Sequence, residues 1–309
     1  MAVDRLSQVF DLVQVRSVLT GGVAARGGWW SRGPIVDPVK FFAMVSGRAR
    51  LTTDGVDRPV ELEPGDVAIL IGRSYVAFEA GDEPRHEVQP ESDFSAAQFV
   101  GANHHTDDVL IGGCVDVNEA GRALLLAALP PVAHVRASVS DAEPLRADLL
   151  RLFDEATSDR IGSAFAIRQY GQLLLLEALR AYVGQADLPP GWLRLLTDER
   201  LRPALDLIRA EPGRAWGLAE LARAAAMSRT SFAERFREVA GMPPLTYLSH
   251  WRMLLAQRAL REDDVRIATL AAELGYGSES AFSTAFKRVV GEAPRRYRLR
   301  VREEAVAAG

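Results

Sequence analysis

Two neighbouring stretches of the chain share one sequence pattern. The first ends at Tyr247 and the second at Tyr297, and they align once a single extra residue, Gly277, is allowed in the second. The alignment pairs Leu221 with Leu270, Ser228 with Ser278, Phe232 with Phe282, Phe236 with Phe286, Gly241 with Gly291 and Pro244 with Pro294. A repeat at this spacing is one supersecondary unit used twice.

Each copy predicts a helix, a tight turn and a second helix. Apolar residues recur at helical spacing up to a turn at Ala226–Met227 in one copy and at 275–277 in the other. Ser228 and Ser278 then stand where an N-cap hydroxyl accepts from the free amides of the next helix. The face of that helix that we expect in the core carries Phe232, Phe236 and Val239 in the first copy, and Phe282, Phe286 and Val289 in the second.

The opposite face of each second helix carries small or polar side chains beside a cation. These residues are Thr230, Ala233, Glu234 and Arg237, and Ser280, Ser283, Thr284 and Lys287. Such side chains suit a helix that lies in the major groove of DNA and reaches base edges. The pattern therefore indicates DNA recognition by two helices of one chain.

The repeat resembles the DNA-binding domain of the AraC/XylS family of bacterial transcription regulators. The matching pieces are MSRTSFAERF, WRMLLAQRAL and ATLAAELGYGSESAFSTAFKRVVGEAPRRYR, within residues 192–298. The resemblance implies contact with DNA by Ser228, Arg229, Thr230, Ala233, Glu234, Arg237, Ser278, Glu279, Ser280, Ser283, Thr284, Lys287, Arg288, Arg295 and Arg296. Arg235 and Arg298 are expected to join the cations that face phosphate or solvent.

Two positions depart from the family pattern. Many members carry a long basic side chain where Thr284 stands, and Ala233 is too short to hydrogen-bond a base. The second copy is therefore expected to contribute mostly affinity. A connecting helix of about 16 residues that starts near Leu245 would span ~24 Å and hold the two recognition helices about one DNA turn, ~34 Å, apart.

Charge argues against a plain bundle of two helical hairpins. Residues 193–302 contain 20 Lys and Arg and 13 Asp and Glu, a net charge of +7, whereas the rest of the chain has a net charge of −11. An acidic body with one basic module is typical of a nucleic-acid-binding protein.

The first third of the chain predicts short strands. Runs at 41–45, 48–53, 60–62 and 67–71 alternate with turn residues, among them Asp54–Gly55. VSGRARLTTDG and LEPGDVAIL resemble the cupin-like sensor domain that precedes this type of DNA-binding domain, and LLLAALPPV resembles the stretch that follows its barrel. Helical spacing of leucines then covers 145–183, for which the resemblance suggests dimerisation and ordinary packing within the chain remains equally open.

Many cupins are metalloenzymes, which require imidazole and carboxylate ligands on adjacent strands. The stretch at 28–31 has no histidine, His86 stands alone, and His104–His105 are expected in a solvated loop. The sequence therefore predicts no metal, cofactor or catalytic residue. A barrel lined by apolar side chains suits a small organic effector instead, with Trp29, Trp30, Phe42, Met44 and Tyr75 as candidate lining residues whose other role is ordinary core.

The expected fold class is α+β and multidomain: an N-terminal antiparallel, cupin-like β-barrel with a helical segment, and a C-terminal all-α domain of two helix-turn-helix units. The expected domains are 1–135 for effector sensing, 136–184 for a helical dimerisation segment, 185–191 for a linker, 192–302 for DNA binding and 303–309 for a flexible tail.

The expected function is sequence-specific DNA binding by a transcription regulator, here taken as an activator. The expected partners are double-stranded DNA, a small-molecule effector, a second copy of the chain and, for an activator, RNA polymerase. The single cysteine, Cys114, and the lack of a signal peptide or of an apolar run of about 18 residues favour the cytoplasm and no membrane. A metal-dependent cupin enzyme with a DNA-binding appendage and an effector-independent DNA-binding protein remain the alternatives.

Overall fold

The structure is a computed structural model that describes residues 5–13, 15, 21–82, 85–90, 102–138, 143–158, 160–185 and 188–307. The chain folds into two compact units. The sheet unit is Val13–Asp187, and the helical unit combines Met1–Leu12 with Leu188–Gly309. The expected first domain, 1–135, thus includes twelve residues that the structure groups with the C-terminal helices. Residues 186 and 187 of the expected linker lie outside the described residues.

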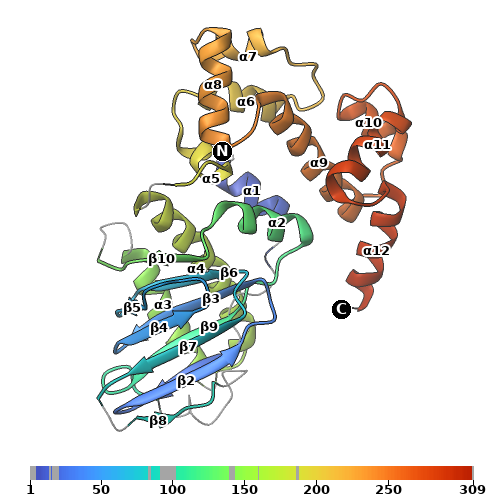
Figure 1. The fold of residues 1–309 in the computed structure, drawn as a ribbon. Helices are drawn as coiled ribbons and strands as arrows, with labels where there is room; N and C mark the ends of the chain where they lie inside the picture. Colours follow the sequence, from blue (N-terminus) through green and yellow to red (C-terminus); the bar gives the residue numbers. More distant parts are fainter. Residues whose placement is uncertain are drawn as a thin grey trace. The chain divides into compact units, whose positions relative to one another are not determined.

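The strands of the sheet unit form two five-stranded sheets, in the orders β1-β9-β3-β6-β10 and β5-β4-β7-β2-β8 (Figure 1). Their bounds are β1 Gly21–Ala25, β2 Trp29–Pro34, β3 Val39–Ser46, β4 Ala49–Thr53, β5 Val60–Leu62, β6 Val67–Ile71, β7 Tyr75–Ala80, β8 His86–Glu87, β9 Asp108–Cys114 and β10 Val132–Val135. Neighbouring strands are antiparallel, except that β2 and β8 run parallel. The strands predicted from the short apolar runs are confirmed, and β4 pairs with β5 across the turn that begins at Asp54.

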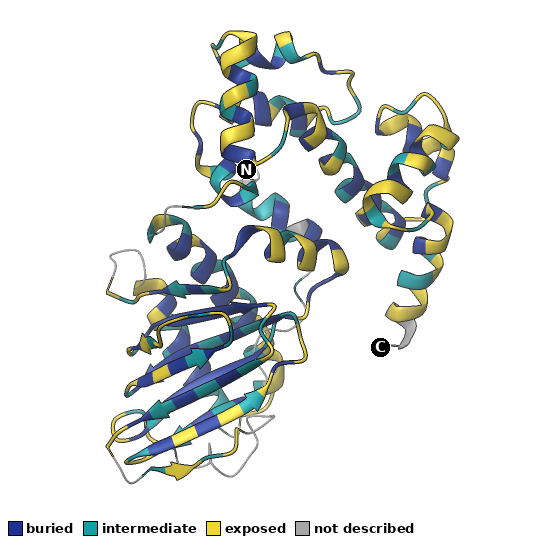
Figure 2. Ribbon diagram, viewed as in Figure 1, coloured by how far each residue is buried: buried dark blue, intermediate teal, exposed yellow. Residues whose placement is uncertain are grey.

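Side chains from both sheets meet in one core. Met44 of β3 and Leu110 of β9 pack with Leu51 of β4 and Phe78 of β7. Figure 2 shows buried and exposed residues alternating along β2, as a strand does when only one face is covered. β6 is buried at every position; it lies between β3 and β10, and helices pack on both of these neighbours.

Among the described residues of this unit, three helices accompany the sheets: α2, Glu119–Ala128; α3, Glu143–Thr157; and α4, Ser163–Gln185. α3 packs on β3 and α4 on β10, so both cover the first sheet. Leu149 and Leu152 of α3 and Leu174 and Leu175 of α4 are buried. The helices predicted over 145–183 are therefore confirmed.

One buried carboxylate ties β10 to the turn before β6. Asp66 accepts hydrogen bonds from the backbone amides of Glu63 at 3.2 Å and Ala137 at 2.7 Å, and its Oδ2 lies 2.9 Å from Nε2 of His134. Burial raises the pKa of Asp66, but these hydrogen bonds outweigh that effect and the pKa is lowered overall. The carboxylate is ionised at neutral pH.

The helical unit contains a short N-terminal helix and the eight described C-terminal helices. Their bounds are α1 Arg5–Val13, α5 Trp192–Thr197, α6 Arg202–Ala210, α7 Leu218–Ala224, α8 Arg229–Ala240, α9 Pro244–Glu262, α10 Ile267–Glu273, α11 Glu279–Val290 and α12 Pro294–Ala307. α9 has 19 residues, so it spans ~28 Å rather than the ~24 Å expected for 16 residues.

The last helix corrects the expected tail. α12 continues through residues 303–307, where Arg300 Nη1 pairs with Glu304 Oε1 at 2.9 Å. An ion pair one turn apart favours helix, and so do the alanines at 305 and 307. Among the described helices of the whole chain, none is long and apolar enough to cross a membrane.

Candidate DNA-binding surface

The two predicted helix-turn-helix units are formed by α7 with α8 and by α10 with α11. Ser228 Oγ accepts from the amide of Ser231 at 3.1 Å, and Ser278 Oγ accepts from the amide of Ala281 at the same distance. Both second helices then end at a left-handed glycine, Gly241 or Gly291. α8 and α11 both begin at a serine N-cap and both end at a glycine, so the predicted repeat is confirmed.

The cores of the two copies repeat ring by ring. Phe232 and Phe236 lie 5.7 Å apart between centroids, and Tyr247 follows at 5.6 Å. In the second copy Phe282 and Phe286 lie 5.7 Å apart, and Tyr297 follows at 5.5 Å. Edge contacts between buried rings fix how each second helix sits on the helix that follows it.

One predicted core position is wrong. Val239 is buried, but Val289, its counterpart, is 37% exposed. α5 packs on α8, and the Gly191 amide donates to the Val239 carbonyl at 2.9 Å. A helix equivalent to α5 is absent from the second copy within the described residues, so Val289 remains at the surface.

Most of the predicted DNA-contacting side chains lie on open surface. Ser228, Arg229, Thr230, Glu234 and Arg237 of the first copy are exposed, and Ala233 is half-buried. In the second copy Ser278, Ser280, Thr284, Lys287, Arg288, Arg295 and Arg296 are exposed, and Glu279 and Ser283 are half-buried. The outward faces of α8 and α11 are therefore accessible over the length that the sequence assigns to DNA.

Two polar groups of the second copy already have partners. The Thr284 hydroxyl donates to the Ser280 carbonyl one turn earlier at 2.9 Å. Glu279 Oε1 lies 3.6 Å from Arg295 Nη2, which neutralises part of the negative charge at the start of α11. Arg295 and Arg296 still leave 82% of their side chains exposed.

Two other cations have structural partners, contrary to the expectation that they face phosphate or solvent. Arg235 forms a two-point contact with Asp198, from Nη2 at 2.7 Å and from Nε at 3.3 Å. Arg298 donates to the Val265 carbonyl and lies 3.8 Å from Asp264. The acceptors of both arginines belong to segments that are distant in the sequence: Arg235 contacts a buried carboxylate and Arg298 a loop carbonyl. The pattern of residues along one helix face does not reveal such partners.

The two copies approach each other closely at two glycines. Gly213 lies in the loop before α7 and Gly275 in the turn before α11, and a Cβ on either residue would overlap a backbone oxygen of the other segment. Arg252 of α9 fastens the same loop by donating to the carbonyls of Pro212 at 2.6 Å and Arg214 at 2.9 Å. Burial lowers the pKa of Arg252, but an arginine keeps its charge at neutral pH.

α1 contacts the helix that precedes each helix-turn-helix unit. Arg209 of α6 donates to Gln8 at 3.3 Å and to the Tyr247 hydroxyl at 3.3 Å. Arg261 of α9 donates to the Leu12 carbonyl and to the Tyr297 hydroxyl, both at 3.4 Å. The same Arg–Tyr pair thus occurs in both copies, which the sequence reasoning missed although both tyrosines were aligned.

The sheet unit contains a cavity of about 270 Å³ between its two sheets. Phe42, a predicted lining residue, lies on its wall. Trp29 and Met44 are instead fully buried in the core, where Trp29 Nε1 donates to Asp108 at 2.8 Å. These two residues face inward as expected but fill space rather than border it.

The other two predicted lining residues lie on the outer face. Alternation along β2 turns Trp30 outward, where it is 38% exposed. Tyr75 of β7 lies on the same side, under the guanidinium of Arg32 at 4.5 Å from the ring centroid. Within the described ranges no three His, Cys, Asp or Glu side chains gather closely enough to hold a metal ion.

Comparison with known proteins gives matches over both units. A family model described as Cupin matches residues 4–184, and one described as Helix-turn-helix domain matches residues 221–300. An AraC-like transcription regulator of Streptomyces lividans is 36% identical over 299 residues, which cover 96% of this chain and 98% of that protein. The HTH-type transcriptional regulator AlkR of Acinetobacter baylyi is 28% identical over 96% of this chain and 99% of its own length.

A solved structure also matches part of the chain. The DNA-binding domain of AdpA, a global transcriptional factor crystallised in complex with a target DNA, covers 35% of this chain and 96% of its own. The sequence identity is 31% and the TM-score is 0.33.

Proposed function

This chain belongs to the AraC family of transcription regulators, and we propose that α8 and α11 read operator DNA while the sheet unit adjusts the affinity. In this proposal the first helix turns Arg229, Thr230 and Glu234 toward bases, and the second turns Glu279, Ser280 and Ser283. The exposed cations near their ends position the protein on phosphates. The protein acts in the cytoplasm, where its operator lies.

The observation that carries this proposal is the duplication itself. Two helices with equivalent caps and equivalent buried rings present accessible outer faces within a region of net charge +7. Two such helices, linked by the ~28 Å of α9, suit successive major grooves on one side of the duplex. A plain helical bundle requires neither the exposed faces nor the excess of cations.

The DNA-binding proposal is tested by fluorescence anisotropy with the DNA upstream of this protein's own gene. A random-sequence duplex and a salt series run beside it. We expect binding that exceeds binding to the random duplex and weakens steeply as salt rises. Absence of binding even at low salt would contradict the proposal.

The division of roles on the surface predicts different effects for two substitutions. Thr230→Ala should change the binding free-energy difference between operator variants by about 1 kcal/mol at one base position, because it removes a hydroxyl from the outward face of α8. Arg296→Ala should weaken binding to all sequences and make the salt dependence shallower by about one unit, because it removes one phosphate contact. Anisotropy against a panel of single-base operator variants measures both. Equal losses on every duplex for both variants would refute the division.

We also propose that the protein is a homodimer joined through α4. Phe165 and Leu173 are 62% and 45% exposed on this helix, and eight residues of separation place them about two turns apart. A second copy of α4 would cover them and complete a regulator with two DNA-binding units. The sheet-unit cavity, in turn, would take the effector.

Sedimentation velocity tests the dimer. Leu173→Glu should weaken self-association by about tenfold or more, because it buries a charge in an apolar contact. Ala164→Glu is the matched control, since residue 164 is exposed on the opposite side of the helix and receives the same charge. Dimers of unchanged affinity in Leu173→Glu would exclude α4 as the interface.

A further inference from the structure

Glycine is frequent in the wall of the sheet-unit cavity. Five of the fifteen described residues that line it are glycine. Gly33 falls on the inward row of β2 after Trp29 and Ser31, and a Cβ added to it would meet no heavy atom within 4 Å. Gly112 of β9 leaves the space that the Phe42 ring occupies, since an added Cβ would lie 2.5 Å from Phe42 Cδ1.

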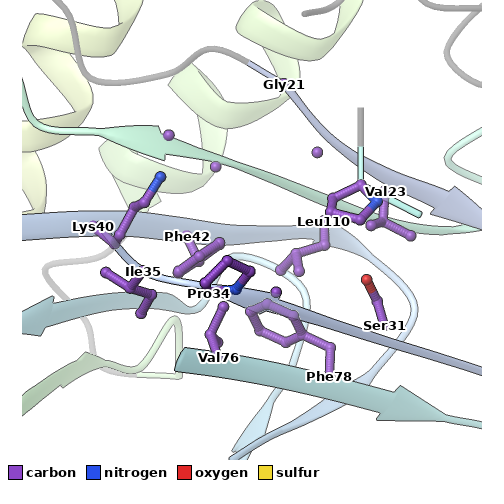
Figure 3. Close-up of a pocket in the computed structure, with 15 residues that line it drawn as sticks. Gly21, Val23, Ser31, Pro34, Ile35, Lys40, Phe42, Val76, Phe78 and Leu110 are labelled. Carbon is purple, nitrogen blue, oxygen red and sulfur yellow. The ribbon is translucent and has the colours of Figure 1, made fainter. Parts of the chain in front are cut away.

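The walls are mainly apolar, with one charge. Ile35, Phe42, Val76 and Phe78 form much of the surface, and Lys40 is the one charged residue among the described residues that line the cavity. Figure 3 shows these apolar side chains grouped between Lys40 at one end and Ser31 at the other. An apolar pocket with a few polar groups at its ends is the usual form of a small-ligand site.

The charge of Lys40 is only partly neutralised within the described chain. Its Nζ lies 3.9 Å from Asp37 Oδ2, beyond hydrogen-bond distance, and 3.0 Å from the Cys114 sulfur. Burial, followed by the hydrogen bond to Asp37, raises the pKa of the Cys114 thiol, so sulfur supplies no counter-charge at neutral pH. A half-buried ammonium in this setting favours an anionic partner.

Ser31 supplies a second polar group. It is 3% exposed, and it lines the cavity. Its hydroxyl can both donate and accept a hydrogen bond, so a polar ligand atom at that end of the cavity can pair with it. Lys40 at one end of the cavity therefore favours an anionic group, and Ser31 at the other end favours a group that forms hydrogen bonds.

We propose that the cavity binds a small monocarboxylate whose anionic group pairs with Lys40, whose apolar body lies between Phe42 and Phe78, and whose far end hydrogen-bonds Ser31. This inference rests on the proposed role of the sheet unit as the effector-binding part of the regulator. The cavity, about 270 Å³, lies near the lower limit for ligand pockets. A compact aromatic or short aliphatic acid matches that size.

Isothermal titration calorimetry of the full-length protein tests the charge. The probes are hexanoate, octanoate, phenylacetate and para-hydroxyphenylacetate, each beside its neutral amide. In the unmodified protein at least one carboxylate should bind about tenfold tighter than its amide. Lys40→Met should abolish this preference and leave the amide affinity unchanged. A carboxylate preference that is absent, or that survives Lys40→Met, overturns the proposal.

Three further variants separate the cavity from the surface. Gly33→Leu should abolish binding of acid and amide alike, because the side chain fills the cavity. Ser31→Ala should remove the advantage, about fivefold, of para-hydroxyphenylacetate over phenylacetate. Arg32→Met is the matched control, since Arg32 is an exposed cation on the outer face of the same strand, and it should bind as the unmodified protein does. Thermal unfolding identifies any variant that fails to fold. The Lys40→Met titration tests the proposal even if Gly33→Leu does not fold.

The titrations contain no DNA, so this inference and the proposed function fail separately. Carboxylate binding through Lys40 without any change in operator affinity supports the ligand site and contradicts its regulatory role. Operator binding in the absence of any carboxylate binding supports DNA recognition and overturns the ligand site.

Discussion

Gly275→Ala is expected to destabilise the helical unit by about 3 kcal/mol and to remove operator binding. Gly275 has a φ of 77°, where an alanine costs roughly 1 kcal/mol. Its added Cβ would also overlap the Gly213 carbonyl oxygen. The loop that carries Gly213 cannot retreat freely, because Arg252 holds the carbonyls on both sides of it.

The first copy provides the matched comparison. Ala226 is the residue equivalent to Gly275, and it adopts a left-handed φ of 51° without being glycine. Ala226→Gly relieves that strain and should stabilise the unit by about 0.5 kcal/mol. Hydrogen exchange measured by mass spectrometry on the full chain locates each effect in the helical unit. If both substitutions changed protection in the same direction, the contact with Gly213 would not be the cause.

Asp66→Ala is expected to destabilise the sheet unit by about 3 kcal/mol. The substitution leaves two backbone amides and the His134 ring without their carboxylate partner. Exchange protection should fall in β6 and β10 and stay unchanged in the helical unit. Glu61→Ala is the control, because Glu61 is an exposed carboxylate in an ion pair with Arg50 and such pairs contribute ~0.5 kcal/mol.

The effect of Asp66 should depend on pH in one direction. The folded protein lowers the pKa of this carboxyl below its ordinary value of 3.8. A lowered pKa stabilises the fold fully above the unfolded-state pKa, and this contribution is lost as pH falls through the folded-state pKa. The difference in unfolding free energy between the unmodified protein and Asp66→Asn should be constant near neutral pH and shrink below about pH 4. A difference that grew with acidification would contradict this assignment.

Local patterns predicted the elements whose partners are close in sequence. The repeat around Phe232 and Phe282 specified caps, turn and core face together, and alternation specified the strands from 41 to 71. α1 was not predicted, because a nine-residue helix gains its stability from partners such as Arg209 and Arg261, far along the chain. Short helices are marginal without such packing.

The candidate sites were predictable to different degrees. The outward faces of α8 and α11 follow from helical periodicity, so their exposure could be expected. Arg235 and Arg298 could not be assigned, because their acceptors depend on loops that tertiary structure brings near. Most residues of the cavity wall were not predicted, because aromatic residues were expected to line it. Glycines such as Gly33 create the open space instead, since they have no side chain.

The grouping of α1 with the C-terminal helices means that the chain enters and leaves the sheet unit from the same helical unit. The sheet unit is therefore an insertion between two segments that pack together. Because it links the two segments in one chain, it makes their packing intramolecular and raises the effective concentration of α1 for its site beside α6 and α9. Unfolding of the sheets would lower that concentration. A fragment that begins after residue 188 would lack α1 altogether. Its two helix-turn-helix units would then lack the contacts that α1 makes with Arg209 and Arg261.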